Sequence, residues 1–297
     1  MNQQLVKPEW LKIKFVQNDN FSGIKETLNK HRLHTVCESA HCPNISECWS
    51  GGTATFMLMG DVCTRGCKFC AVKTGNPRKE LDKDEPRKLA EAIAEIKLFD
   101  YVVLTSVNRD DLDDGGSGHF AECITEVKKE YPKIIIEVLI PDFKGDIDSL
   151  KKIIDANPEV IAHNIETVER LQKKVRDPRA NYRQSLSVLE NIKKLNPKIY
   201  SKSAIMLGFG ETDEEIIQAM EDLRTVDCDI LTIGQYLRPS DWHLPINNFV
   251  PPEKFKYFEQ KALELGFLYC ASGPFVRSSY KAGELFMKNV IRNKPLQ

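Results

Sequence analysis

Cysteines are the residues of this chain with the clearest capacity for chemistry, and most of them lie in one short segment. Six of the nine cysteines fall between residues 37 and 70, in two groups of three. The first group has the spacing C-x4-C-x5-C, and the second has the spacing C-x3-C-x2-C. Thiolates gathered in this way are ligands for iron–sulfur clusters or for other soft metal sites. The first group is Cys37, Cys42 and Cys48, and the second is Cys63, Cys67 and Cys70.

Each group supplies three thiolates, whereas a cubane cluster has four iron corners. The second group therefore suits a cluster with one iron that has no protein ligand, and such an iron can bind a small molecule. The first group also needs a fourth ligand if its cluster is to be closed, and that ligand must come from elsewhere in the chain.

Two other uses of these cysteines have to be weighed. A disulfide framework is typical of small secreted domains, but this chain has an odd number of cysteines and begins without a signal peptide pattern. Structural zinc usually takes four ligands from paired knuckles or from Cys/His mixtures, and here the set divides into two threes. Zinc remains the stronger of the two alternatives.

The composition predicts a globular protein of a reducing compartment. The chain has 297 residues, 41% of them hydrophobic, and its 42 basic and 43 acidic residues give a net charge of −1. Such a balance gives no general attraction to nucleic acid or to an anionic membrane. Apolar runs are too short to span a bilayer, and free cysteines persist where thiols stay reduced. We therefore expect a cytoplasmic protein without nucleic-acid or membrane partners.

Apolar strand patterns alternate with helical patterns after the first cysteine group. Each apolar run is bounded by glycine, proline or polar residues, and a stretch with helical periodicity follows it. The expected strands are 53–61, 99–107, 133–142, 159–167, 199–210 and 229–237. The expected helices are 84–97, 119–130, 147–156, 168–175, 182–195, 213–226 and 252–265.

This alternation predicts an α/β fold with a parallel sheet and right-handed crossovers. Six βα units are fewer than the eight of a full barrel, so the expected architecture is a partial (β/α)6, TIM-like barrel. Extensions at both ends would cover its mouth, all in one compact unit. The expected segments are an N-terminal extension with the first cysteine group (1–52), the barrel (53–237) and a C-terminal extension (238–297).

Functional residues in parallel α/β folds collect where the strands end, because the following loops converge there. The second cysteine group follows the first expected strand. Other polar or glycine residues in equivalent places are Asn108, Asn164, Glu166, Gly208 and Gly210. We expect these five to contact a cofactor, although strand-end glycines are often only turn residues and strand-end polar residues are often solvated. His163 and the isolated cysteines 123, 228 and 270 are expected to be structural.

A C-x3-C-x2-C loop after the first strand of a six-unit barrel resembles the radical S-adenosylmethionine enzymes. Within them the chain resembles the lipoyl synthase family over nearly its whole length. The segments that carry this resemblance are CESAHCPNISEC, GGTATFM, CTRGCKFCAV and the terminal Arg277-Ser278-Ser279-Tyr280. Both cysteine groups at this separation make the combined signal specific.

The resemblance implies a reaction, cofactors and partners. A 4Fe-4S cluster on Cys63, Cys67 and Cys70 would bind S-adenosylmethionine at its open iron, and a 5′-deoxyadenosyl radical would abstract hydrogen from C6 and C8 of an octanoyl-lysine. A second, auxiliary 4Fe-4S cluster on the first cysteine group would donate both sulfur atoms. The family places a serine of the Arg-Ser-Ser-Tyr motif as its fourth ligand, which here implies Ser279, with Ser278 as the near alternative.

The implied partners are octanoylated lipoyl carrier domains, both in the acyltransferase subunits of 2-oxoacid dehydrogenases and in the glycine-cleavage H protein. A reductant such as ferredoxin or flavodoxin and a carrier that rebuilds the auxiliary cluster would also be required. Another radical enzyme with an auxiliary cluster is the alternative within the same class. A two-cluster electron carrier, or a zinc-stabilised interaction protein, is the alternative that is not an enzyme.

Overall fold

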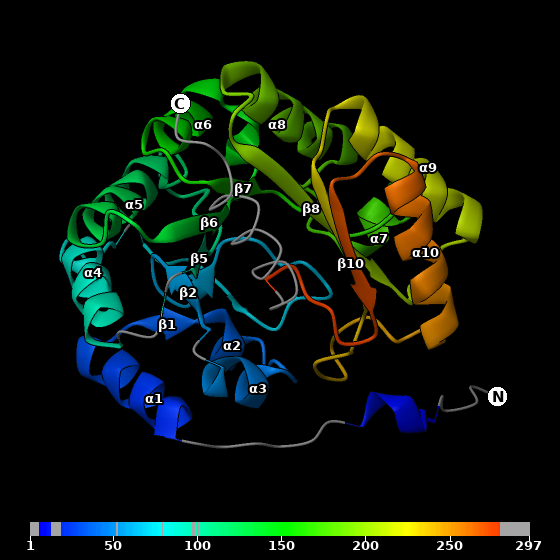
Figure 1. Cartoon of the computed structure of the whole chain (residues 1–297), viewed down its shortest axis with the longest axis horizontal. Helices are drawn as coiled ribbons and strands as arrows, with labels where there is room; N and C mark the ends of the chain where they lie inside the picture. The colour runs from blue at the N-terminus through cyan, green and yellow to red at the C-terminus, as the bar shows by residue number, and fades with distance from the viewer. Residues whose placement is uncertain are drawn as a thin grey trace.

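The architecture is a curved, mostly parallel sheet that carries helices on its outer face (Figure 1). The computed structural model describes residues 6–12, 19–51, 53–78, 80–96, 99 and 101–279. Tyr280 of the Arg-Ser-Ser-Tyr motif and the rest of the C-terminal segment lie outside these described residues.

Eight strands form the main sheet in the order β1-β2-β5-β6-β7-β8-β9-β10. All neighbours from β2 to β10 pair in parallel, and only β1 at one edge is antiparallel. The two edge strands, β1 and β10, do not pair with each other, so the described sheet is an incomplete barrel. The strands are β1 (His34–Thr35), β2 (Thr55–Leu58), β5 (Tyr101–Ser106), β6 (Ile135–Leu139), β7 (Val160–Ala162), β8 (Tyr200–Leu207), β9 (Ile230–Gln235) and β10 (Tyr269–Gly273).

The crossover helices follow the strands as the helical periodicity predicts. Their apolar faces pack on the sheet, while their basic and acidic residues, apart from buried Glu85 of α4, are exposed or partly exposed. These helices are α4 (Glu85–Ile96), α5 (Ser117–Glu130), α6 (Ile147–Asp155), α7 (Gln172–Val175), α8 (Tyr182–Leu195), α9 (Asp213–Thr225) and α10 (Pro252–Glu264). Thr212 caps α9 with a full capping box, in which its hydroxyl accepts the Glu215 N–H.

The N-terminal segment packs the first cysteine group against the barrel. It contains η1 (Glu9–Leu11), α1 (Asp19–His31), α2 (Val36–Ser39) and α3 (Ile45–Ser50). Helix α1 lies against both α3 and α4, and the rings of Phe21 and Trp49 meet at 5.0 Å between centroids. Helix α1 thus holds the segment to the barrel.

Two strands of the main sheet were not predicted from the sequence. Strand β10 adds a seventh parallel strand from the segment that we expected to be only an extension, so the sheet continues past residue 237. Its six-residue run LYCASG is short and ends at a Gly-Pro pair, which masked the strand pattern. Strand β1 has only two residues, too few to give a period.

A buried ion pair lies within the sheet, below the end where the strands finish. Lys202 Nζ lies 2.7 and 2.9 Å from the two carboxylate oxygens of Glu137, and the Tyr101 hydroxyl donates to the same carboxylate at 2.5 Å. All three side chains are fully enclosed. They fill the lower part of the barrel and leave the upper part, at the carboxyl ends of the strands, for a cavity.

Candidate active site

A cavity of about 540 Å³ occupies the carboxyl-terminal end of the barrel. Its lining includes all six cysteines of the two groups, together with Ser278 and Ser279. The N-terminal segment, the loop after β2 and the C-terminal segment, which are far apart in sequence, therefore meet around one space. A cavity of this size is typical of small-molecule sites.

Backbone N–H groups surround the second cysteine group. Cys63 ends the short strand β3 (Val62–Cys63), and its sulfur accepts the N–H groups of Arg65 at 3.4 Å and Asn108 at 3.3 Å. The sulfur of Cys67 accepts the N–H of Asp177 at 3.3 Å. N–H donors of this kind favour thiolate ligands and tune a bound cluster. Burial raises the pKa of Cys67 to about 11 and that of Cys70 to about 12, so these sulfurs would become thiolates on binding metal.

The first cysteine group lies on the N-terminal helices. Cys37 belongs to α2, Cys48 belongs to α3, and Cys42 lies in the turn between them. Burial raises the pKa of Cys37 to about 11 and also raises the pKa of Cys42. A protonated, enclosed thiol is a poor nucleophile, so these side chains suit metal ligation better than thiol catalysis.

The spacing of the sulfur atoms tests the zinc alternative. Three thiolates on one zinc ion lie about 3.8 Å apart, since each Zn–S bond is about 2.3 Å and the geometry is tetrahedral. Within the described residues, only Glu85, His119 and Cys123 form a trio whose ligand atoms all lie within 4.8 Å of one another. Neither cysteine group is that compact, and a cubane cluster, which places its own iron and sulfide between the thiolates, needs the wider spacing.

The compact trio has a different explanation. The Glu85 carboxylate accepts the N–H of Met59 at 2.9 Å and lies 2.6 Å from His119 Nε2. Met59 follows β2 directly and has a left-handed backbone, with φ 66°. The pair therefore fixes the turn through which β2 leads into the cysteine loop.

Arg65 anchors the cysteine loop to the ends of two strands. Its guanidinium is 4% exposed and makes paired bonds of 2.7 to 2.9 Å to the carboxylates of Asp110 and Asp142. Burial alone would raise the pKa of Asp142, but the hydrogen bonds and charge of Arg65 lower it to about 2. Two fixed carboxylates on one guanidinium hold the loop in a single orientation.

Three of the five predicted cofactor contacts line the cavity: Asn108, Asn164 and Glu166. Asn164 Nδ2 donates to Glu166 at 3.2 Å, whereas Asn164 Oδ1 is buried without a partner in the described structure. Glu166 has φ 66°, a strained backbone for a residue of this kind. Burial raises the pKa of its carboxyl.

Further unpartnered oxygens line the same cavity. Ser106 Oγ and Thr232 Oγ1 are buried, and the described residues offer neither of them a hydrogen bond. With Asn164 they give three polar atoms that await partners from a bound molecule. Ser106 ends an expected strand, where functional residues collect, whereas the position of Thr232 inside the barrel depends on the sheet register.

Gly208 and Gly210 lie elsewhere. Neither lines the cavity, and both have positive φ values, of 112° and 100°. A side chain on Gly208 would overlap Gln235 and the Asn248 carbonyl, and one on Gly210 would crowd Asn247. Both glycines therefore allow close packing of the 247–248 backbone, and their position gives no support for the predicted cofactor contact.

The C-terminal segment returns to the cavity beside the first cysteine group. The Asn44 amide, between Cys42 and Cys48, donates to the Phe275 carbonyl at 2.7 Å. Gly234 of β9 leaves room for the Val276 carbonyl, which a Cβ at Gly234 would overlap. This close crossing puts Ser278 and Ser279 at the cavity wall.

Two buried side chains near the loop share the Ser185 hydroxyl. His163 is structural, as expected: its ring nitrogens lie 2.9 Å from the Ile140 carbonyl and from Ser185 Oγ, and burial lowers its pKa to about 4. Arg176 is buried, lines the cavity and donates to Ser185 Oγ at 2.9 Å. The role of Arg65 was missed, although its charge within the cysteine motif was a usable signal.

Comparison with protein families gives two matches. A model described as the radical SAM superfamily matches residues 57–223. A model described as the N-terminal domain of lipoyl synthase of that family matches residues 1–42.

Curated relatives are similar over nearly the whole chain. Lipoyl synthase of Halobacterium salinarum is 60% identical over 291 residues, which cover 96% of this chain and 93% of the relative. Lipoyl synthase of Anaeromyxobacter sp. is 54% identical over 289 residues, covering 97% and 98%. The mitochondrial lipoyl synthase of Homo sapiens is 53% identical over 297 residues, covering 98% and 80%.

Solved structures support the fold. Methylornithine synthase matches with a TM-score of 0.55 at 14% identity, covering 82% of this chain and 83% of that one. The hydrogenase maturase HydG from Carboxydothermus hydrogenoformans matches with a TM-score of 0.55 at 13% identity, covering 92% and 78%. At these identities the likeness concerns the partial barrel alone.

The Arg65 anchor gives a first prediction. In Arg65→Lys a single ammonium replaces the planar guanidinium and cannot make paired hydrogen bonds to both carboxylates. The negative charge of buried Asp142 then lacks full compensation. We expect the anaerobically reconstituted variant to lose the iron bound at the second cysteine group and to keep the iron bound at the first group. Mössbauer spectroscopy with iron analysis measures the iron at each group. Arg87→Lys, at an exposed position of α4, is the control. Full iron content in Arg65→Lys would contradict the anchoring role.

The crossing at Gly234 gives a second prediction. In Gly234→Ala the added methyl pushes away the Val276 carbonyl and, with it, Ser279. We expect weaker iron retention at the first cysteine group and an unchanged second group, measured in the same way. Gly23→Ala is the matched control, because a Cβ there meets nothing within 4 Å. Equal iron retention in both variants would show that the crossing does not position the serine.

Proposed function

This chain belongs to the lipoyl synthase family of the radical S-adenosylmethionine superfamily, and we propose that the barrel cavity performs the family's reaction with the residues described above. The chain is a lipoyl synthase, an enzyme that inserts two sulfur atoms at C6 and C8 of a protein-bound octanoyl-lysine. Its cofactors are two 4Fe-4S clusters and S-adenosylmethionine. When bound, these groups supply the electron, the hydrogen-abstracting radical and the sulfur.

Cys63, Cys67 and Cys70 would hold the cluster that binds S-adenosylmethionine. The proposal is supported by the three N–H groups that donate to Cys63 and Cys67, and by the absence of a fourth protein ligand in the motif. Arg65 would keep this loop facing the cavity.

The unpartnered oxygens beside the loop would orient the cosubstrate. Asn164 Oδ1 needs a donor, and the Ser106 and Thr232 hydroxyls can either donate or accept. The ammonium and hydroxyl groups of S-adenosylmethionine are donors, and its carboxylate is an acceptor. Asn108 and Glu166 would add contacts from neighbouring strand ends.

Cys37, Cys42 and Cys48 would hold the auxiliary cluster, with Ser279 as the fourth ligand. The proposal is supported by the return of the C-terminal segment to the same cavity wall through the Asn44–Phe275 bond. Ser278 lines the same wall and is the alternative ligand. In iron–sulfur clusters, iron binds an oxygen ligand less well than a thiolate. A serine ligand would therefore favour release of its iron, as a cluster that is consumed requires.

The space between the two cysteine groups would take the octanoyl chain. The cavity is lined by apolar side chains of several strands, among them Met57, Leu139 and Met206, and by Val276 of the C-terminal segment. An alkyl chain buried there would have its middle carbons between the two cluster sites while water is excluded. All three segments, 1–52, 53–237 and 238–297, would act as one catalytic unit.

Lipoyl carrier domains are the substrates that this function implies. We extend this to the acyltransferase subunits of 2-oxoacid dehydrogenases, the glycine-cleavage H protein, a reductant protein and a cluster-rebuilding carrier. No helix in the described part of the chain is long and apolar enough to cross a membrane. We propose a reducing compartment, the cytoplasm, and the nine free cysteines support this proposal.

One observation carries the assignment of residues: seven side chains from three distant segments, the six cysteines and Ser279, line a single cavity. An electron carrier would need neither this cavity nor a cluster with an open iron. Another radical enzyme with an auxiliary cluster shares the fold, as the low-identity structures do, but does not account for the full-length relatives.

Incubation of the reduced, reconstituted enzyme with S-adenosylmethionine and an octanoyl-lysine carrier peptide tests this function. We expect mass spectrometry to show two sulfur atoms gained and two hydrogen atoms lost on the lysine arm, with methionine and 5′-deoxyadenosine formed. Modification of a free small molecule but not of the peptide would contradict the assignment.

The serine ligand is tested by two neighbouring substitutions. We expect Ser279→Cys to keep an auxiliary cluster but to lose product, because a fourth thiolate holds the iron that must be released. Ser278→Cys is the matched control and should keep both cluster and product. Full product in Ser279→Cys, or loss only in Ser278→Cys, would move the ligand role away from Ser279.

A further inference from the structure

Three segments meet on the outer side of the second cysteine group, at Lys68. This exposed residue lies between Cys67 and Cys70. Its N–H donates to the Val175 carbonyl at the end of α7, at 2.9 Å. Its carbonyl accepts the Leu244 N–H at 3.1 Å. Leu244 belongs to residues 238–249, which we call the strap.

The strap brings an aromatic pair to this loop. His243 Nε2 lies 2.9 Å from the Cys70 carbonyl oxygen, and its Nδ1 lies 2.8 Å from Ser240 Oγ. The ring of Trp242 meets the His243 ring edge-on at 5.0 Å and is 67% exposed. The exposed indole of Trp242 is thus adjacent in sequence to His243, which contacts the backbone of Cys70. Tryptophan is the side chain most often found as an energetic centre of protein interfaces.

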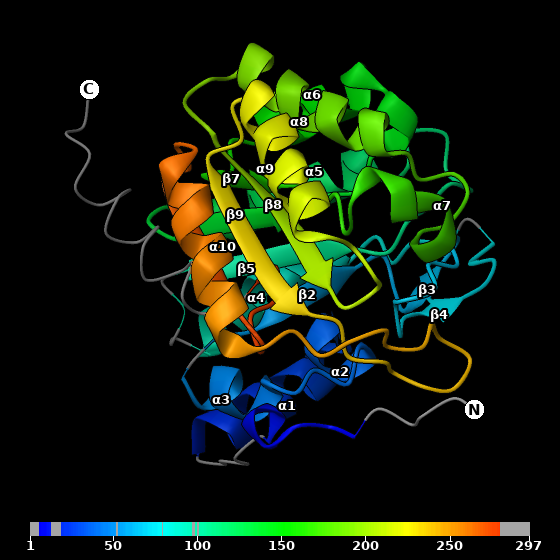
Figure 2. The ribbon, with the colours of Figure 1, turned by 90° about the vertical axis from the view of Figure 1, so that its right-hand side faces the viewer.

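Four lysines lie on the two segments, the cysteine loop and α7, that meet the strap at Lys68. Lys68 and Lys73 project from the cysteine loop, and Lys173 and Lys174 project from α7. All four are exposed, and in the described structure none of them forms an ion pair, whereas Lys30, Lys88 and Lys128 elsewhere do. Figure 2 shows α7, the pair β3–β4 (Lys73–Thr74 in β4) and the strap on the same side of the molecule. We call this surface the basic face.

The four lysines and Trp242 do not line the cavity, although Arg238 and Pro239 of the strap do. An octanoyl arm inside the cavity would therefore not touch the lysines or Trp242. The face is instead next to the outer backbone of Cys67 and Cys70. A partner bound there would approach the cluster site from the side opposite the substrate.

We propose that the basic face docks a small acidic electron-transfer protein that reduces the cluster held by Cys63, Cys67 and Cys70. This inference rests on the proposed function. One electron leaves the reduced flavin or iron–sulfur group of the donor and enters this cluster for each S-adenosylmethionine that is cleaved. Trp242 anchors the donor, and the lysines attract its carboxylates, which accelerates encounter. A donor bound here needs no opening of the cavity.

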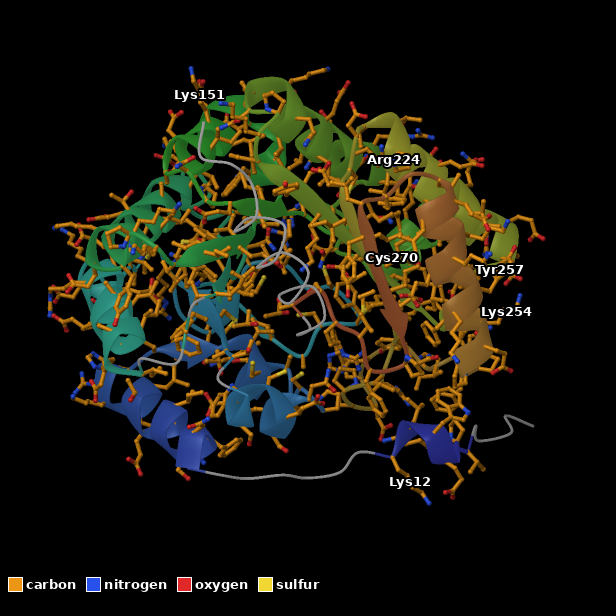
Figure 3. All side chains as sticks on the ribbon, in the orientation of Figure 1. Lys12, Lys151, Arg224, Lys254, Tyr257 and Cys270 are labelled. Carbon is orange, nitrogen blue, oxygen red and sulfur yellow. The ribbon has the colours of Figure 1, made fainter. Side chains whose placement is uncertain are left out.

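Charge reversal on the basic face is the main test. The variant Lys73→Glu/Lys173→Glu/Lys174→Glu is compared with Lys133→Glu/Lys151→Glu/Lys198→Glu, which changes the net charge equally but elsewhere. Lys151, for example, lies on α6, at the top of Figure 3. The measured rate is that of 5′-deoxyadenosine formation by the holoenzyme, with either reduced flavodoxin or dithionite as the electron source.

With flavodoxin at low ionic strength, we expect the basic-face variant to need roughly tenfold more donor for half-maximal rate, because charge steering governs encounter. Its rate with dithionite should be unchanged, and the control variant should match the native enzyme with both reductants. Added salt should reduce the difference. Trp242→Ala should also weaken the response to flavodoxin, whereas Leu263→Ala on exposed α10 should not.

Binding gives a readout that does not depend on turnover. Isothermal titration of the holoenzyme with oxidised flavodoxin should show a weaker Kd for the basic-face variant and an unchanged Kd for the control variant. An equal response of both variants to flavodoxin would overturn the proposal. Equal losses with dithionite and flavodoxin would also overturn it, because the side chains would then act on the cluster site itself.

The octanoyl carrier is the other possible occupant of this face. A rise in the KM for the carrier without a change in the flavodoxin response would assign the face to the carrier and overturn the proposal. Absence of S-adenosylmethionine cleavage by the native enzyme with dithionite would be a different failure. That result would overturn the proposed function, and with it this inference.

Discussion

The structure depends on a deficit of ligands: each cysteine group offers three thiolates to a cluster with four corners. At the loop with Cys63, Cys67 and Cys70 the fourth corner would face a cavity that holds unpartnered polar oxygens. At the N-terminal helices another part of the chain would have to fill the fourth corner. We propose that the C-terminal segment does so, because its close crossing at Gly234 returns it to the cavity wall. Both the N-terminal and the C-terminal segments would therefore be needed at one site.

Hydrogen bonds, ion pairs and helix packing then fix the positions of the two cysteine groups relative to the cavity. Arg65 joins the cysteine loop to strands β5 and β6 through two carboxylates, and Glu85 with His119 fixes the turn that enters the loop. The N-terminal helices are held by packing of α1 against α3 and α4. Because both sites lie on such supports, an alkyl chain placed between them would meet both in one binding mode. The strap adds a route on the outer side for a partner.

Much of this could be predicted from the sequence, because the signals were local. The two cysteine spacings predicted the ligand sets, and the alternation of apolar and helical runs predicted six parallel strands, which the sheet contains in chain order. Strand β10 was missed because its run is short and bounded by Gly-Pro. Gly208, which we predicted as a cofactor contact, packs against the strap. The position of Thr232 inside the barrel depends on the three-dimensional register of the sheet, which no local pattern contains. The choice of Ser279 came from family resemblance and not from spacing.

The central claim is that the chain builds two separate cluster sites on one cavity. The most direct measurement is the iron and acid-labile sulfide content of two triple variants after anaerobic reconstitution, Cys37→Ala/Cys42→Ala/Cys48→Ala and Cys63→Ala/Cys67→Ala/Cys70→Ala. The account predicts about four of each per chain in either variant, and about eight of each in the native protein. Loss of all iron from either variant, or zinc in place of iron in the native protein, would contradict it.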